Sequence, residues 1–236
     1  MESFDTLLEE SALTHGHLCP GQVVGVRMAI LGCKLIELDN PKSREQIKQL
    51  LVYVEMDRCT ADAVAYVTGV KLGRRSLKFM DYGIMAATFV NLSTGKSFRI
   101  ISTEESRDLS DVYAPEIAEK SGKQLLAYKR MPDSVLFRVQ KVHVHIKDID
   151  LPGPTREKAR CGRCGQIIRD GRQVEKDGEI LCKPCAGDCY FHHAAEITWP
   201  EMNWSPENRT HEKTHPCSGN GTVLGRSRQS CPMEND

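Results

Sequence analysis

Apolar residues recur over residues 20–38 at alternating intervals of four and three, which predicts an amphipathic helix. The recurring residues are Val24, Met28, Leu31, Leu35 and Leu38. Gly25, Ala29 and Gly32 form a second stripe of small residues, which predicts that another backbone packs closely against this helix. Cys33, on the apolar side of the helix, is predicted to be a core residue.

Mixed periodicities follow as far as residue 150. The expected elements, in chain order, are a strand at 51–56, a helix at 60–68, a hairpin at 85–101, a helix near 114–128 and a strand at 134–146. Residues 1–150 are therefore predicted to form one α+β domain that carries the first candidate site.

The pattern changes after residue 150. Leu151–Pro154 contains two prolines around a glycine and is predicted to be a linker. A small module is expected at 156–190, since 236 residues suffice for one full core and a module. Residues 191–236 are poor in aliphatic side chains and have no periodicity, so a disordered tail is predicted there.

Two Cys-x-x-Cys pairs, with seventeen residues between them, lie in the small module. Their cysteines are Cys161, Cys164, Cys182 and Cys185. This spacing is typical of a structural zinc site, in which four thiolates surround one ion at about 2.3 Å. Gly162 and Gly165 suit a tight turn with positive φ. The alternatives are two disulfides, four unrelated thiols, or Cys189 in place of Cys185, although a helix that begins at Cys182 favours Cys185.

A second cluster precedes the first predicted helix, in the order His15-Gly-His17-Leu-Cys19-Pro20. Proline is favoured at the first helical position, so Cys19 is expected at the N-cap. The free N–H groups and the helix dipole there favour a thiolate.

Cys59 is predicted to occupy a similar helix start, with Arg58 beside it. Two such cysteines with neighbouring histidines indicate either a metal site with an open position or an activated thiol. The alternative is that Cys19 is a packing thiol and one histidine is a local cap. Asp62, in the first turn of the helix at 60–68, could accept a hydrogen bond, act as a fourth ligand, or be only a helix-start charge.

Charged side chains say less about function than the cysteines and histidines do. Lys71, Arg74, Arg75 and Lys78 indicate either a solvated hairpin or an anion-binding rim. The whole chain has 32 basic and 32 acidic residues, so no net field attracts nucleic acid or anionic membrane.

The cellular compartment is predicted from the N-terminus and the cysteines. The start of the chain is acidic where a signal peptide is basic and then apolar, and no apolar run reaches 18 residues. Ten cysteines without a secretion signal favour a reducing compartment, which predicts a cytoplasmic protein without membrane contact.

The motif His15–Gly21 resembles the opening motif of the formylmethanofuran dehydrogenase FmdE family. The segments Glu55–Val64, Val67–Arg74 and Asp81–Gly83 agree with it, and the resemblance extends from residue 10 to about 190. It implies a thioredoxin-like mixed sheet flanked by helices and followed by a treble-clef zinc finger. It also implies a metal-binding active site around the His-Cys motif. The family is named for gene association with a molybdenum or tungsten enzyme of one-carbon metabolism.

The resemblance implies a metal-binding enzyme or accessory protein linked to one-carbon or molybdopterin metabolism. His17, Cys19 and Cys59 are the candidate catalytic residues, and with His15 they are the candidate ligands of a second zinc or other divalent transition metal. The finger is expected to hold one structural zinc. Subunits of a molybdenum or tungsten oxidoreductase, or a second copy of the chain, are the candidate partners.

Two other functions stay open. The finger could be an interaction module, although eight Lys and Arg against six Asp and Glu over 151–190 are too small an excess to favour nucleic acid. A thiol-dependent redox protein is the other alternative, but Gln22 stands where a Cys-x-x-Cys partner of Cys19 would be.

Overall fold

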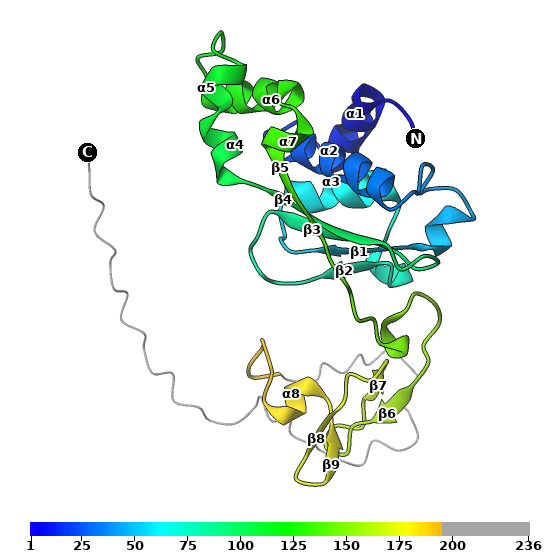
Figure 1. Ribbon diagram of the computed structural model, residues 1–236. Helices are drawn as coiled ribbons and strands as arrows, with labels where there is room; N and C mark the ends of the chain where they lie inside the picture. Colours follow the sequence, from blue (N-terminus) through cyan, green and yellow to red (C-terminus); the bar gives the residue numbers. More distant parts are fainter. Residues whose placement is uncertain (195–236) are drawn as a thin grey trace, which may run out of the picture. The chain divides into compact units, whose positions relative to one another are not determined.

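Residues 1–194 are described by the structure, a computed structural model (Figure 1). The chain divides into an N-terminal unit, Met1–Pro154, and a C-terminal unit that begins at Thr155. Most of the tail predicted to be disordered, from residue 195 onward, lies outside the described residues. Within the described part of the chain, no helix is both long and apolar enough to cross a bilayer.

The N-terminal unit combines one sheet with several helices. Its strands are β1 (Leu50–Val54), β2 (Leu77–Phe79), β3 (Ala86–Asn91), β4 (Ser97–Ser102) and β5 (Phe137–Lys141). Its α-helices are α1 (Phe4–His15), α2 (Pro20–Leu35), α3 (Cys59–Thr68), α4 (Glu104–Asp108), α5 (Ser110–Tyr113), α6 (Lys120–Arg130) and α7 (Asp133–Leu136). Its 3-10 turns are η1 (Gln46–Lys48), η2 (Leu72–Arg74) and η3 (Asp148–Asp150).

The sheet has the strand order β2-β1-β3-β4-β5. β1 and β2 are parallel and are joined by a crossover through α3, whereas every other neighbouring pair is antiparallel. Val52 of β1 stands opposite Leu77 on one side and Phe89 on the other. This mixed sheet confirms the predicted α+β class and its thioredoxin-like arrangement.

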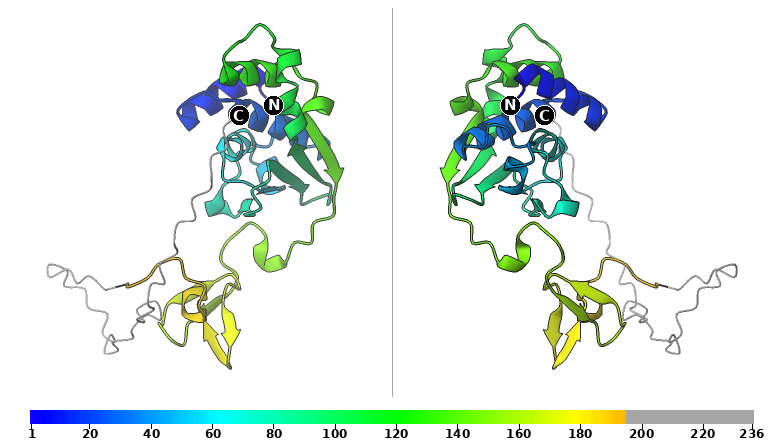
Figure 2. Two further views of the ribbon diagram at one scale, coloured as in Figure 1. Left: turned by 90° about the vertical axis from the view of Figure 1, so that its left-hand side faces the viewer. Right: turned by 90° about the vertical axis from the view of Figure 1, so that its right-hand side faces the viewer.

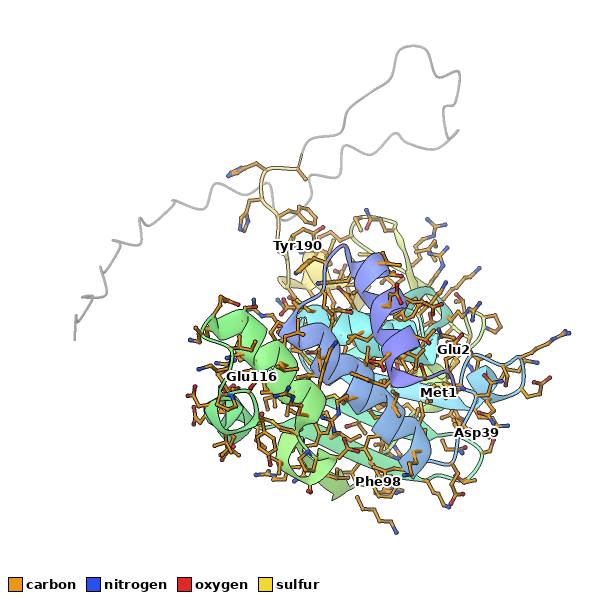
Figure 3. All side chains as sticks on the ribbon, turned by 90° about the horizontal axis from the view of Figure 1, so that it is seen from above. Met1, Glu2, Asp39, Phe98, Glu116 and Tyr190 are labelled. Carbon is orange, nitrogen blue, oxygen red and sulfur yellow. The ribbon has the colours of Figure 1, made fainter. Side chains whose placement is uncertain are left out.

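The main helices gather on one face of this sheet (Figures 1 and 2). Seen from above, α2 runs between α1 and α6 (Figure 3). Strand residues that alternate toward this face, such as Val52, Phe89 and Ile100, are fully buried. Met28 of α2 and Val64 of α3 belong to the same core. The sheet and its helices therefore bury one continuous apolar layer, in which the predicted core residue Cys33 is also buried.

The stripe of small residues on α2 allows close packing, as predicted. A Cβ added at Gly25 would lie 2.6 Å from both the Thr60 carbonyl oxygen and the Ala63 Cβ of α3. One added at Gly32 would lie 2.4 Å from the Phe89 ring of β3. Larger side chains at these two positions would therefore push α2 away from α3 and from the sheet.

The predicted strand at 134–146 is wrong at both ends. Residues 133–136 form α7, in whose first turn the Asp133 carboxylate favours a helix start through the helix dipole. β5 pairs with β4 only over Phe137–Lys141. The predicted helix near 114–128 begins later, at Lys120, where the Glu119 carboxylate accepts hydrogen bonds from the N–H groups of Ser121 and Gly122.

The basic run after α3 is not a hairpin. It forms η2 and then β2, at the edge of the sheet. The Arg75 guanidinium donates to the Ile149 carbonyl, and Lys78 Nζ donates to the Asp150 carbonyl at 2.7 Å. Burial and the nearby Asp150 carboxylate raise the pKa of Tyr53 in the adjacent strand. Two of the four basic side chains thus hold η3 against the sheet edge.

The C-terminal unit has two short hairpins and one short helix. Its elements are β6 (Lys158–Arg160), β7 (Ile167–Arg169), β8 (Val174–Lys176), β9 (Glu179–Leu181) and α8 (Lys183–Ala186). β6 pairs with β7 and β8 pairs with β9, both antiparallel. The first Cys-x-x-Cys pair lies between β6 and β7, and the second spans the start of α8. A knuckle, a hairpin and a helix in this order make the treble-clef finger that was predicted.

Replacing Gly25 by Ala is expected to destabilise the protein. Ala favours a helix by about 1 kcal/mol over Gly, but overpacking against the fixed backbone of α3 at Thr60 is expected to cost about 2–3 kcal/mol, the upper part of the usual range of about 1–3 kcal/mol. We expect the free energy of unfolding, measured by urea titration with far-UV circular dichroism, to fall by about 1–2 kcal/mol. Gly73→Ala is the control, since its Cβ meets nothing within 4 Å. Equal stability of the two variants would contradict the close packing of α2 on α3.

Candidate metal centres

The four cysteines of the finger converge as the spacing predicted. The sulfurs of Cys161, Cys164, Cys182 and Cys185, called the finger cluster below, all lie within 4.8 Å of one another. Cys164 Sγ and Cys182 Sγ are 3.7 Å apart. Four sulfurs at about 2.3 Å from one ion would be about 3.8 Å apart, whereas a disulfide needs about 2.05 Å. All four are free thiols, so the geometry fits a four-coordinate ion.

Local backbone places these sulfurs. Gly165 adopts a positive φ of 73° and its N–H donates to the Cys161 carbonyl at 2.9 Å, which closes the knuckle. Gly162 does not adopt positive φ, and its N–H donates to the Ile180 carbonyl at 2.8 Å. Cys182 is the N-cap of α8, so the helix starts at the second pair as predicted.

The thiols of the finger cluster differ in acidity. Burial opposes ionisation of Cys161, but backbone N–H groups of Cys164, Cys182 and Arg163 outweigh it and lower the pKa of Cys161 to about 6. Burial raises the pKa of Cys185, and the neighbouring thiols raise it further. Four thiolates together therefore need a cation to offset their mutual repulsion.

Few other side chains could hold the finger together. Its buried cluster consists of Ile168, Leu181 and three of the cysteines, with Cys164 and Ala186 packed against them. So small an apolar core cannot offset the ordering entropy of the module, which is the usual situation of domains folded by a structural metal.

The N-terminal cluster (His15, His17, Cys19 and Cys59) forms where three helices meet. α1 ends at His15, Gly16 caps it with φ of 99°, and Cys19 is the N-cap of α2. This short connection brings one ligand atom of each of His15, His17 and Cys19 within 4.8 Å of the others. The two imidazole rings lie 4.8 Å apart, centre to centre.

Cys59, in the first turn of α3, borders this group but is not among the three residues whose ligand atoms all lie within 4.8 Å of one another. A Cβ built on Gly21 would lie 3.0 Å from Cys59 Cβ and 3.7 Å from Cys19 Sγ, so both cysteines touch the same point of α2. Burial raises the pKa of the Cys59 thiol, and its hydrogen bond with the Cys19 thiol raises it further. These two effects oppose the stabilisation of a Cys59 thiolate by the helix start.

His15 is held like a metal ligand. Its Nδ1–H donates to the Asp62 carboxylate at 2.9 Å, and its side chain is only 14% exposed. Its other nitrogen, Nε2, is buried and has no hydrogen-bond partner. Metal-binding histidines commonly donate their second nitrogen to a carboxylate in this way. Asp62 thus fits the role of hydrogen-bond acceptor, one of the three alternatives, and it contacts His15 instead of a cysteine.

Gln22 ties the three helices together, a role that the sequence did not predict. It is fully buried in the first turn of α2. Ser11 Oγ of α1 donates to Gln22 Oε1 at 2.6 Å, and Gln22 Nε2 donates to the Cys59 carbonyl at 2.8 Å. A polar residue in an otherwise apolar helix pattern was the only available signal.

A small pocket of about 90 Å³ is lined by Gly21 and Thr60 but by none of the four residues of the N-terminal cluster. Arg107 and Tyr128 line its other side. This volume corresponds to about three water molecules at ~30 Å³ each, so only a small ligand group would fit. A wider hollow of about 450 Å³ near Met1 and Asp39 has no cysteine or histidine in its lining.

Among the comparisons with known proteins, a family model matches most of the N-terminal unit. The family described as "FmdE, Molybdenum formylmethanofuran dehydrogenase operon" matches residues 14–141, more than half of the chain. A curated relative from Archaeoglobus fulgidus, named a probable S-adenosyl-L-methionine-binding protein, is 26% identical over 191 residues. That match covers 75% of this chain and 51% of the relative, so the chain spans about half of the relative's length.

A solved structure has the same fold. It is the 1.90 Å crystal structure of a tungsten formylmethanofuran dehydrogenase FmdE-like protein from Syntrophus aciditrophicus. The match has a TM-score of 0.53 and 20% identity, and it covers 80% of this chain and 95% of the other.

Gln22→Leu is expected to lower the free energy of unfolding by about 1–3 kcal/mol, because it leaves the buried Ser11 hydroxyl without its acceptor and removes a hydrogen bond to the Cys59 carbonyl. Ser11→Ala removes one of these groups, so the double variant should cost less than the sum of the single variants. Urea unfolding of the four proteins measures this coupling. Strict additivity would show that the two side chains do not interact.

Proposed function

Because this chain belongs to the FmdE family, named for the molybdenum formylmethanofuran dehydrogenase operon, we propose that it is a metal-binding protein with two separate sites. One is the finger cluster and the other is the N-terminal cluster. The family membership and the two Cys/His groups support metal binding. The identity of each ion, the ligand sets and the metabolic role are our proposal.

The observation that carries the N-terminal site is the buried, unpartnered Nε2 of His15. A buried nitrogen without a partner is costly unless something binds it. With Nδ1–H donated to Asp62, Nε2 presents a lone pair beside His17 and Cys19. A metal ion would satisfy all three groups at once, and His15 and His17 were both candidate ligands from the sequence.

Nitrogen and sulfur donors together suit zinc or another divalent transition metal. We assign His15, His17 and Cys19 as ligands, with Cys59 as the fourth group or as the group displaced when a substrate binds. An ion with an open coordination position would polarise a carbonyl or activate water.

The finger cluster is proposed to hold one structural zinc. A closed set of four thiolates leaves no open position for chemistry, and the small core of the finger needs the ion to fold. Its 3.7 Å sulfur separation matches one edge of a zinc tetrahedron.

The proposed setting is cytoplasmic one-carbon or molybdopterin-linked metabolism, with subunits of a molybdenum or tungsten oxidoreductase as partners. It rests on the family and on the name of the Syntrophus protein. An S-adenosylmethionine-binding role, suggested by the name of the Archaeoglobus relative, is not adopted because the chain spans only half of that protein. An interaction role for the finger and a homodimer remain alternatives to be tested by co-purification.

Reciprocal variants test the two metal sites. Cys19→Ala is expected to lose the metal of the N-terminal cluster and to keep that of the finger, because the two clusters lie in separate units. Cys161→Ser should do the opposite and should also unfold residues 160–190. Metal content of anaerobically purified protein, measured by plasma mass spectrometry, is compared with that of Cys33→Ser, whose thiol is buried in the core. Equal metal content in Cys19→Ala and the wild type would refute the N-terminal site.

Metal affinity of the N-terminal site should fall as the pH falls. A metal ion such as Co²⁺, the probe in this experiment, must displace protons from thiols and imidazoles, whose ordinary pKa values are about 8.5 and 6.5. Below the thiol pKa, each thiol proton that the metal must displace lowers the metal affinity about tenfold for every pH unit that the pH falls. Titration with Co²⁺, followed by thiolate-to-metal absorption in protein whose finger is already filled, gives the slope. A Kd that is the same at pH 6 and pH 8 would exclude thiolate ligands.

A further inference from the structure

Cys19 and Cys59 are forty positions apart in the sequence, and the fold brings them together. The sequence argued against thiol redox chemistry because Gln22 stands where a Cys-x-x-Cys partner would be. The tertiary structure supplies a different partner. We propose that Cys19 and Cys59 form a reversible disulfide when no metal occupies the N-terminal cluster, so that this cluster is also a redox-sensitive site. The metal-dependent part of this proposal rests on the proposed function.

The close packing of α2 against α3 brings Cys19 and Cys59 near each other. Cys19 is the N-cap of α2 and Cys59 is the first residue of α3. A Cβ built on Gly21 would lie 3.0 Å from Cys59 Cβ and 3.7 Å from Cys19 Sγ. The two cysteines therefore border the same small space beside Gly21. Thr60 Oγ1 donates to the Gly21 carbonyl at 3.1 Å and holds the two helix starts at this spacing.

The two thiols are also accessible. Cys19 and Cys59 are both partly exposed, as an oxidant requires. Cys33, on the same helix as Cys19, is fully buried, and burial raises its pKa to about 12. Cys33 therefore provides an unreactive control within the same unit.

The oxidation balances with hydrogen peroxide as the oxidant. One thiolate attacks a peroxide oxygen, the O–O bond breaks, and a sulfenic acid forms as hydroxide leaves. The second thiolate attacks that sulfur, the S–O bond breaks, and the S–S bond forms as a second hydroxide leaves. The two sulfurs lose two electrons, which peroxide accepts, and the two thiol protons end in two water molecules. A small-molecule dithiol reverses the reaction by thiol–disulfide exchange.

Metal binding and the disulfide exclude each other. The thiolate is the form of cysteine that binds metal, and a sulfur joined to another sulfur has lost that charge. An ion held by Cys19 would therefore slow oxidation, and oxidation would release the ion. The finger cluster would keep its own ion, since its cysteines lie in the other unit.

Trypsin separates the relevant cysteines. Cleavage after Arg27, Lys34, Arg58 and Lys71 places Cys19 in peptide 1–27, Cys33 in peptide 28–34 and Cys59 in peptide 59–71. The full chain is treated with hydrogen peroxide, with and without added Zn²⁺, and free thiols are blocked with N-ethylmaleimide before digestion. Mass spectrometry then follows peptide 1–27 linked to peptide 59–71.

We expect this linked peptide to be the main crosslink, to disappear in Cys19→Ser and in Cys59→Ser, and to persist in Cys33→Ser. Dithiothreitol should remove it. Crosslinks mainly to Cys33 or to the finger, or only sulfinic acid at unlinked Cys19 and Cys59, would overturn the proposal. If the link forms at the same rate with and without Zn²⁺, the thiol pair stands and the proposed metal site falls. Slower linking in Zn²⁺ supports both.

Discussion

The close approach of α2 and α3 is the constraint on which the N-terminal unit depends. Gly25 allows contact with the backbone of Thr60, and Gly32 allows contact with the Phe89 ring. These contacts seat α2 on both its neighbouring helix and the sheet. One turn earlier, Gly21 lies against Cys59 in the same way. The packing that closes the core is therefore the packing that assembles the site, so stability and chemistry share one set of small residues.

Hydrogen bonds from neighbouring side chains hold the N-terminal cluster in place. Asp62 of α3 orients His15 at the end of α1, while Gln22 of α2 connects Ser11 of α1 with the carbonyl of Cys59. Each of the three helices thus contributes one candidate ligand or thiol of the proposed site and one group that positions it. Such support from surrounding residues is what keeps metal ligands and thiol pairs in register. It also explains why a short, glycine-containing connection between α1 and α2 can be tolerated.

The finger follows a different principle. Its buried cluster is mostly sulfur, and the N–H groups that lower the pKa of Cys161 belong to the knuckle and the start of α8. The negative charges of four neighbouring thiolates would repel one another, and a bound cation would offset this repulsion. In this unit the proposed ion would take the place of an apolar core, whereas in the N-terminal unit an apolar core already exists and an ion would add chemistry.

The sequence by itself determined the helical stripe of α2, the hairpin of β3 and β4, the two Cys-x-x-Cys pairs and the His-Cys motif. These follow from local periodicity and spacing, which neighbouring residues decide. The start of β5, the missed strand β2 and the clamp of Arg75 and Lys78 on η3 depend on pairing between distant segments. The contact of Asp62 with His15 and the role of Gln22 were likewise decided only by tertiary structure, whereas the grouping of Cys59 with Cys19 was predicted from their two helix starts and from the family resemblance. Residues forty or more positions apart meet only through packing, and no local pattern records which distant partner a side chain will reach.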